Sequence, residues 1–348
     1  MHVSRMALAI AGLTAMVLAA EPAAAHPAWG LVVARDGSIY FSDVGRNVVW
    51  RAGMDGRLQV VVRDRHSHIL NLEADGALVG EHVEYDEPRR LWRRSVWRLD
   101  PAGLTVFEAD EYIPTAGVEV AGERIVVETT EEPPRQIRVV GWRDGERRVI
   151  AGGEAGDVDG IGDAARFSGI NALVRGSDGT SVVVTDGARV RRITLDGQVV
   201  TLARAEMERI RRGPHPRLLG LAVEGEDVYV ADYDHHQVRR ITGAGRLDTV
   251  LHSGPWWSPA AVAVANGRLY VVEDRPESLL YLLSLVSGPR LRIVDADGTT
   301  LVVATAWRPG VIAGAAALLA TALLFLWRFR PRRRGTRARP GLKPHLQI

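Results

Sequence analysis

The sequence predicts an all-β fold: a six-bladed β-propeller of four-stranded antiparallel blades, followed by one transmembrane α-helix. The first observation behind this prediction is a repeat of short alternating apolar runs with a period of about 40 to 50 residues, which is typical of propeller blades. The repeats occupy residues 38–51, 77–99, 124–140, 182–193, 228–241 and 268–294. The second is an Asp-Gly or similar tight-turn signal between the runs. The third is an uncharged segment near the C-terminus, which predicts the helix.

Six expected blades account for nearly all of the region between the two ends of the chain. They span residues 29–63, 66–109, 113–151, 168–203, 217–252 and 258–305. Turn signals join the first two strands of each blade at 36–37, 75–76, 121–122, 178–179, 225–226 and 266–267, and the last two at 55–56, 103, 144–145, 196–197, 245 and 297–298. Because antiparallel strands alternate in direction, we expect all these turns on one side, the turn face. The ends of the second strands and the inter-blade loops then lie on the opposite side, the loop-rich face.

The two ends of the chain predict export and a membrane anchor. In the N-terminal segment Arg5 precedes an apolar stretch that ends in small residues, which is typical of a secretory signal peptide. The uncharged segment 309–327 is about 19 residues long, enough to cross a hydrocarbon core of about 30 Å. Residues 328–348 carry eight basic and no acidic side chains, which indicates a cytoplasmic tail. The expected domains are a signal peptide (1–25), the propeller (26–307), a transmembrane helix (308–328) and a basic tail (329–348).

These domains place the protein in a bacterial cytoplasmic membrane, with a single span and the propeller outside the cytoplasm. The strong preference for Arg over Lys is typical of a GC-rich bacterial genome. Only about four residues separate Thr305 from Pro309, a reach of about 13 Å, so the loop-rich face is expected close to the bilayer. Once the tail is set aside, the propeller is acidic, and nucleic acid is not an expected partner. The chain has no Cys, so the exported domain has no disulfides.

The repeats resemble a known group of propellers. The acidic end of each second strand, the Arg-Ile third strands and the segment 151–167 are similar to NHL repeats, with residues 168–203 as the best match. The wider resemblance is to the NHL-repeat and gluconolactonase-like six-bladed propellers, which include lactonases, lyases and binding modules. It implies the architecture more firmly than an activity. It also implies a structural role for the six acidic residues that end the second strands, Asp43, Glu81 (or, in another register, His82), Glu128, Asp186, Asp232 and Glu273.

A histidine-rich group in the second blade is the candidate metal site. His66 and His68 precede the first strand, and Glu81 and His82 are expected to end the second, so pairing brings them to one mouth. Imidazole and carboxylate groups bind zinc, calcium or another divalent metal. Glu81 and His82 point to opposite sides of a strand, so at most three of the four can meet. The favoured alternative is ordinary polar hydrogen bonding in a mouth loop.

A second group of residues is expected to bind a ligand at the loop-rich face. Imidazoles and aromatic rings in the turns and loops offer hydrogen bonds and stacking, or contact with a membrane interface. The candidates are Trp29, Asn171, Asp232, His235, His236, Trp256 and Trp257. By resemblance, Asn171 corresponds to an Asn ligand of the lactonases, whereas Trp29 stands near the point where those enzymes have a Glu.

Two further segments allow more than one interpretation. Residues 157–163 space their carboxylates like a short calcium loop, but the match to an NHL inter-blade turn favours a structural loop. Residues 279–286 are unusually apolar and fit a lid, a lipid contact or a displaced third strand.

The predicted function is a ligand-binding or scaffolding module whose partner, a small molecule or a protein, engages the loop-rich face. The alternative is a lactonase-like hydrolase or a lyase that depends on one divalent metal held by His66, His68, Glu81 and His82, with Asp232 as a further ligand or general base.

Overall fold

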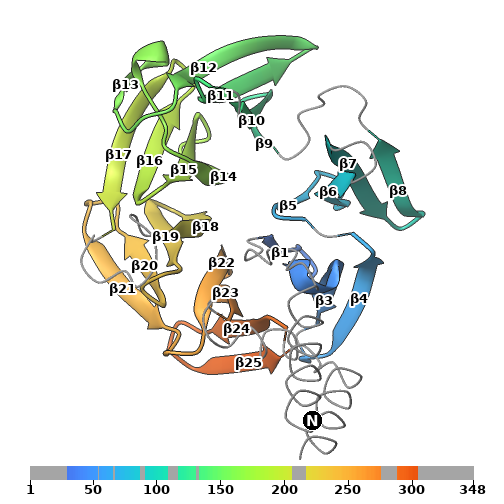
Figure 1. Ribbon diagram of the computed structural model, residues 1–348. Coiled ribbons are helices and arrows are strands. Elements are labelled where there is room, and N and C mark those ends of the chain that lie inside the picture. The colour runs from blue at the N-terminus through green and yellow to red at the C-terminus, as the bar shows by residue number, and fades with distance from the viewer. Residues whose placement is uncertain are drawn as a thin grey trace, which may run out of the picture. The chain divides into compact units, whose positions relative to one another are not determined.

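The computed structural model describes residues 30–53, 55–65, 67–86, 91–108, 117–130, 133–205, 217–275 and 288–304 (Figure 1). The chain divides into two compact units, residues 1–306 and 307–348. All described residues belong to the first unit. The predicted signal peptide, transmembrane helix and basic tail lie outside them, and so do Trp29 and His66. Within the described ranges no helix is long and apolar enough to span a bilayer.

The first unit is a six-bladed β-propeller, as the sequence predicts. Blade 1 consists of β1 (Leu31–Val33), β2 (Ile39–Asp43), β3 (Val48–Ala52) and β4 (Leu58–Arg63), with the short 3-10 helix η1 (Val44–Arg46) after β2. Blade 2 consists of β5 (Leu70–Leu72), β6 (Leu78–Asp86), β7 (Leu91–Asp100) and β8 (Gly103–Glu108). Blade 3 consists of β9 (Val118–Val120), β10 (Glu123–Thr130), β11 (Gln136–Arg143) and β12 (Glu146–Glu154).

The remaining blades follow the same order along the chain. Blade 4 contains β13 (Gly160–Ile161), the 3-10 helix η2 (Gly162–Ala164), β14 (Ile170–Arg175), β15 (Ser181–Asp186), β16 (Arg189–Thr194) and β17 (Gln198–Arg204). Blade 5 consists of β18 (Leu218–Glu224), β19 (Asp227–Asp232), β20 (Gln237–Ile241) and β21 (Leu247–His252). Blade 6 consists of β22 (Ser258–Ala265), β23 (Arg268–Asp274), β24 (Arg290–Val294) and β25 (Thr300–Ala304).

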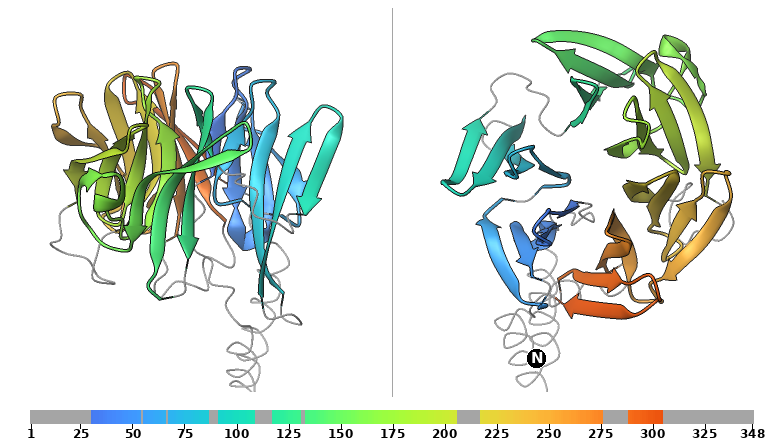
Figure 2. Two further views of the ribbon diagram at one scale, coloured as in Figure 1. Left: turned by 90° about the horizontal axis from the view of Figure 1, so that it is seen from above. Right: turned by 180° about the vertical axis from the view of Figure 1, so that it is seen from behind.

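Each blade is a consecutive antiparallel meander, and the blades surround a common centre (Figure 1; Figure 2, right). The first strand of each meander lies nearest the centre, and the last forms the outer edge in every blade except blade 4. The hairpins fall at the predicted turns, where residues such as Asn266 and Gly267 adopt positive φ. The turn face and the loop-rich face therefore exist as expected.

Two details differ from the prediction. Blade 4 has five strands, because β13, from the segment interpreted as an inter-blade turn, pairs with the outer edge of β17. The second strand of blade 2 does not end at Glu81 and His82; β6 continues to Asp86 because its pairing with β7 extends that far. Residues 279–286 lie outside the described ranges, so their three interpretations stay open.

The core consists of apolar clusters between neighbouring blades rather than one central core. Successive side chains of a strand point to opposite faces of its sheet. Each blade can therefore pack apolar side chains against the blades on both sides. One cluster seals the ring between the first and last blades, where Phe41 and Ala52 meet Tyr270 and Leu291. In the described part of the chain every blade is a contiguous segment, so the first and last blades are joined there by this apolar contact and not by a shared sheet. Among the described residues no cluster spans blades 2 and 3, which are joined by the Asn71 amide donating to the Gly117 carbonyl (3.2 Å).

Candidate functional site

The turn between β19 and β20 in blade 5 holds a buried acid–imidazole pair. Asp232 ends β19, and its side chain has no exposed surface. Its Oδ1 atom lies 2.7 Å from Nδ1 of His235, and its Oδ2 atom accepts a hydrogen bond from the Gln237 amide (3.3 Å). The carboxylate therefore fixes the orientation of the imidazole, as a structural turn residue does.

The same turn is tied to the loop that leads into blade 6. His236 adopts positive φ (57°), which turns its ring towards that loop. Its Nδ1 atom lies 2.8 Å from the carbonyl oxygen of Trp257 and 2.9 Å from Oγ of Ser258. The neighbouring Trp256 is 57% exposed. The contacts of His236 thus bring the turn and the loop together, and Trp256 precedes Trp257 in that loop. We call the five predicted ligand-binding residues of these two segments the blade 5–6 cluster: Asp232, His235, His236, Trp256 and Trp257.

Two arginines contact the ring of Trp257. Cζ of Arg275 lies 4.5 Å and Cζ of Arg290 lies 4.2 Å from its centroid, within cation–π range. Arg290 is held by Glu273, whose fully buried carboxylate also accepts from Arg292 (2.6 and 3.0 Å). Burial lowers the pKa of Arg275, and the positive charge of Arg290 lowers it further. Sequence reasoning did not select these arginines, because the chain is rich in Arg and only the strand register shows which of them reach Trp257.

The acidic residues at the ends of the other second strands are occupied by structural contacts. Asp43 accepts from Arg46 (2.7 Å) and the Trp50 indole (3.2 Å). Asp186 accepts two backbone amides of the preceding loop and the guanidinium of Arg191 (2.7 Å). Glu128 pairs with Arg147. These contacts agree with the structural role that the resemblance implies for these residues.

The blade 2 residues do not assemble a metal-binding group in the described part of the chain. Glu81 pairs across the sheet with Val96, and His82 pairs with Ser95, so the two side chains lie on opposite faces of the blade. The backbone amide of Glu81 donates to Ser67 Oγ (2.7 Å), and His82 is buried. Nowhere in the described ranges do three or more His, Asp or Glu side chains lie close enough to hold a metal. The metal hypothesis, which includes His66 outside these ranges, stays a prediction.

Asn171 joins two inner strands. Its amide donates to the carbonyl oxygen of Leu218 (3.0 Å), which links blade 4 to blade 5. Asn71 makes the corresponding contact from blade 2 to blade 3. Asn171 therefore acts as a latch between blades 4 and 5, and Leu218, which it contacts, pairs across the sheet with Asp232 of the blade 5–6 cluster.

Residues 157–163, whose carboxylates are spaced like those of a short calcium loop, form ion pairs with arginines. Asp157 pairs with Arg189 (2.6 Å), and Asp159 pairs with Arg191 (2.7 Å) and accepts the backbone amide of Thr201. Arg191 is fully buried and also stacks on Phe167. Since these carboxylates point to cations of blade 4, the segment serves as a structural clasp that positions β13.

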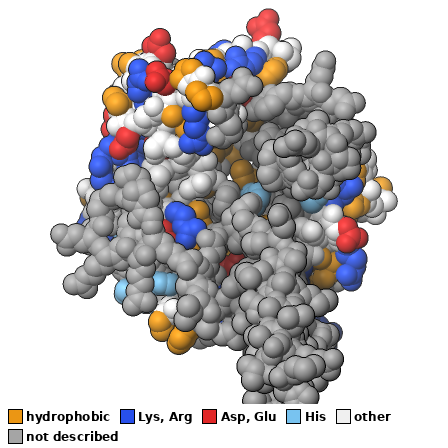
Figure 3. Space-filling view, in the orientation of Figure 1, with side chains coloured by type: hydrophobic (Ala, Val, Ile, Leu, Met, Phe, Trp, Pro, Cys, Tyr) orange, Lys and Arg blue, Asp and Glu red, His pale blue; other side chains and the backbone are white. Residues whose placement is uncertain are grey.

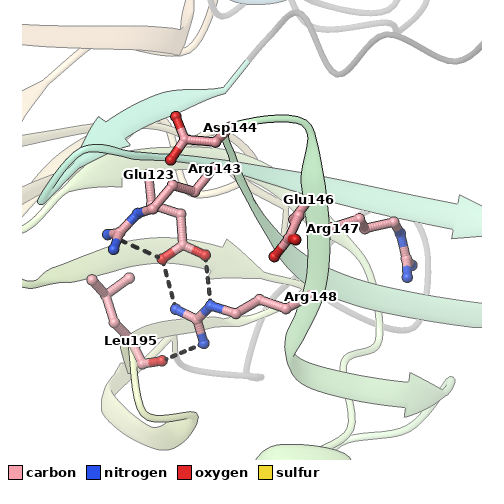
Figure 4. Close-up of a pocket in the computed structure, with 7 residues that line it drawn as sticks. All are labelled: Glu123, Arg143, Asp144, Glu146, Arg147, Arg148 and Leu195. Atoms are coloured by element: carbon pink, nitrogen blue, oxygen red, sulfur yellow. Dashed lines mark hydrogen bonds and ion pairs between the residues drawn. The ribbon is translucent and has the colours of Figure 1, made fainter.

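A polar hollow of about 560 Å³ lies between the outer strands of blades 3 and 4 (Figure 4). Its charges are largely paired internally: Glu123, which is buried, accepts two hydrogen bonds from Arg148 (2.6 and 2.7 Å), and Arg148 donates to the Leu195 carbonyl. A Cβ at Gly141 would overlap the Glu123 carboxylate, so this glycine makes room for the pair. The hollow is therefore an ion-pair junction between blades, and none of the predicted site residues lines it.

The face of the molecule shown in Figure 3 carries basic and acidic side chains interspersed with apolar ones. They do not gather there into a single basic patch of the kind that binds nucleic acid. This distribution agrees with the pairing of Arg with Asp and Glu throughout the described blades.

Comparisons with known proteins identify the fold. No protein-family model and no curated protein matches the chain. A luciferin-regenerating enzyme matches with TM-score 0.53 and 15% identity over 77% of this chain and 91% of that one. The nidogen/laminin complex matches with TM-score 0.51 and 13% identity over 76% of this chain and 91% of that one.

A calcium-binding protein, regucalcin of Agrobacterium tumefaciens, matches with TM-score 0.48 and 14% identity over 74% of this chain and 86% of that one. A putative gluconolactonase and virginiamycin B lyase from Staphylococcus aureus also match, with TM-scores of 0.47 and 0.43. Of these matches, the two with TM-scores above 0.5 come from an enzyme and from a protein complex. At these identities they show a six-bladed propeller and no particular function.

Proposed function

We propose that this protein is a membrane-anchored, extracytoplasmic propeller that acts as a ligand-binding or scaffolding module through its loop-rich face. The observation that carries the proposal is the blade 5–6 cluster. Five residues selected for ligand binding lie in a turn and a loop about 20 residues apart in sequence, and the contact of His236 Nδ1 with the Trp257 carbonyl oxygen (2.8 Å) joins the two segments.

The chemistry of this cluster suits recognition of a ligand. The 57% exposed indole of Trp256 offers a rigid apolar surface, and the imidazoles beside it are held in fixed orientations. Sites for small molecules and for protein partners combine these features, because aromatic rings supply contact area at a low cost in conformational entropy. The membrane anchor and the export signal in this proposal rest on the sequence alone.

The alternative, a metal-dependent hydrolase or lyase, needs about three protein ligands converging on one point. Glu81 and His82 lie on opposite faces of β6, so only one of them could join His66 and His68. Within the described ranges no three His, Asp or Glu side chains lie close enough to hold a metal. Because His66 lies outside these ranges, the alternative stays a prediction, and we prefer ligand binding because the blade 5–6 cluster supports it.

A thermal-shift screen of the purified full chain tests the proposal. The probes are phosphate esters, sugar acids, amines and nucleosides, and the variants are Trp256→Ser and Phe107→Ser. Phe107 is the matched control, since it is also an exposed aromatic residue (49%) but belongs to β8 of blade 2.

We expect at least one class of probe to raise the melting temperature of the parent and of Phe107→Ser, and to have a much smaller effect on Trp256→Ser. The proposal is wrong if no class raises the melting temperature. It is also wrong if the shift survives in Trp256→Ser but disappears in Arg268→Gln, which changes the turn side of blade 6.

A further inference from the structure

Blade 4 shows how one arginine of a third strand can hold two carboxylates. Arg191, on β16, donates through Nη1 to Asp186 (2.7 Å) and through Nε and Nη2 to Asp159 (3.1 and 2.7 Å). Thr201, opposite Arg191 on β17, donates its backbone amide (2.9 Å) and its hydroxyl (3.0 Å) to the same Asp159 carboxylate. An arginine and a threonine paired across two strands thus form a carboxylate site, which the blade 4 clasp fills.

Blade 5 repeats this pair of residues in the same register. Arg239 on β20 lies opposite Thr249 on β21, and in both blades the register shifts directly before the arginine. Directly opposite residues project from one face of a sheet. Nη1 of Arg239 lies 4.0 Å from Oδ2 of Asp232, so it faces the acid that ends the second strand, as Nη1 of Arg191 does. By the same register, the backbone amide of Thr249 faces away from β20.

The Nε edge of Arg239 lacks the partner that its counterpart in blade 4 has. Among the described residues no atom accepts a hydrogen bond from the buried Nε, and Asp232 is the one acid there that pairs with this arginine. A buried N–H group without an acceptor is costly. Thr249 is exposed, and its hydroxyl donates to the amide oxygen of Gln237 (3.1 Å). The donors that bind a carboxylate in blade 4 therefore recur in blade 5, where no described residue supplies that carboxylate.

Such a site does not require an unpaired cation, because the guanidinium of Arg191 holds two acids at once. A planar guanidinium offers separate edges to separate acceptors. The corresponding pair in blade 6 is Arg292 and Val302. Arg292 also has a buried Nε without an acceptor among the described residues, but valine has no hydroxyl. Within the described blades, blade 5 is thus the one that combines the threonine with an unpartnered arginine edge.

We infer that Arg239 and Thr249 form a binding site for a carboxylate, either the Asp or Glu side chain of a peptide or a small organic acid. The Nε–Nη2 edge of Arg239 binds the carboxylate, and the hydroxyl and amide of Thr249 bind its oxygens, as in blade 4. Charge-assisted hydrogen bonds of this kind are among the stronger ones in proteins.

The site is built for a single carboxylate. Arg189, which binds a second acid of the clasp, Asp157 (2.6 Å), is replaced in blade 5 by the neutral Gln237 at the same register position. The blade 5 site therefore has one cation where blade 4 has two. This inference goes beyond the proposed function, since Trp256 takes no part in it.

The test is a ligand-observed NMR titration of the full chain, which measures affinities down to the millimolar range. One probe is the end-blocked peptide Gly-Asp-Val-Asp-Gly-Ile-Gly, the sequence of residues 156–162, with an Asp159→Asn version as its control. The other is propionate, with propionamide as its uncharged control. The central variant is Arg239→Gln. Its matched control is Arg240→Gln, because Arg240 is the next residue of β20, points to the opposite face and pairs with Asp248.

We expect the charged probes to bind the parent and Arg240→Gln, with an affinity about tenfold lower in Arg239→Gln. Arg239→Lys, which keeps the charge beside Asp232 but loses the planar fork, should fall between the two. Thr249→Val should also weaken binding while it leaves the buried arginine in place. A peptide that binds more tightly than propionate identifies a polypeptide as the source of the carboxylate, and equal affinities identify a small acid.

The inference is overturned if neither charged probe binds the parent, or if the uncharged controls bind equally well. It is also overturned if Arg239→Gln, Arg239→Lys and Thr249→Val bind as the parent does while their circular dichroism spectra show folded proteins. Trp256→Ser separates this result from the proposed function. Carboxylate binding should survive that substitution, and its loss there would move the acid to the blade 5–6 cluster and remove the site at Arg239.

Discussion

The blade 2 group and the blade 5–6 cluster look alike in sequence, since each offers imidazoles and carboxylates near a strand end, yet they differ in the structure. In blade 2, Glu81 and His82 are consecutive residues inside a strand that continues to Asp86, so pleating separates them. In blades 5 and 6, a turn that begins at Asp232 meets a loop that ends at Trp257. Side chains can converge where two irregular segments meet. In such segments successive side chains need not point to opposite faces, as they do in a strand.

The largest expected effect tests how far the blade 5–6 cluster depends on its buried acid. Replacing Asp232 by Ala should lower the free energy of unfolding by about 3 kcal/mol, because His235 and the nearby Arg239 lose a fully buried partner. Urea denaturation measures the change. Asp163→Ala, in the exposed part of the blade 4 clasp, is the control and should change stability little. An equal effect of both substitutions would contradict this assignment.

A smaller effect is expected in the pH dependence of stability, to which carboxylates of the turn face contribute. On the turn face, hydrogen bonds from the amide and hydroxyl of Ser38 lower the pKa of Asp36 below its ordinary 3.8, and those of Thr299 do the same for Asp297. A lowered folded-state pKa contributes stability above the unfolded value, and that contribution disappears as the pH falls through the folded value. Asp36→Asn should therefore flatten the decline of stability below pH about 4, as measured by urea unfolding at several pH values. A variant profile parallel to the parent's would count against the two hydrogen bonds.

The smallest expected effect concerns metal at blade 2. We expect the purified protein to contain less than stoichiometric zinc or calcium and to keep its melting temperature in a chelator, since Glu81 and His82 diverge. Mass spectrometry of bound metals, with His68→Ala and the exposed control His252→Ala, checks this expectation. Stoichiometric metal that is lost only in His68→Ala would instead support the hydrolase or lyase and would remove the contrast between the two sites.

The sequence was a good guide wherever a local signal controls local structure. Each Asp-Gly or Asn-Gly pair predicted a hairpin, because few other residues adopt the required positive φ, and the blades follow from those turns. It was a poor guide to strand length and to added strands. Nothing local marks β6 as running past His82, or β13 as an outer strand, because both depend on pairing with a partner strand.

The candidate site divides in the same way. The residue types of the blade 5–6 cluster could be selected from the sequence, because imidazoles and tryptophans in turns and loops are unusual. Arg275 and Arg290 could not, since the chain is rich in Arg and many of the described arginines pair with acids. Only the register of β22, β23 and β24 shows that these two arginines share the ring of Trp257.

By itself the sequence determined the repeat, the turns and the two faces of the propeller, because alternation and hairpin geometry act over a few residues. The tertiary structure alone decided which carboxylates are neutralised by arginines and which aromatic ring receives two cations. Those outcomes depend on contacts between strands and loops that are distant along the chain, and such contacts form only when the blades pack against one another.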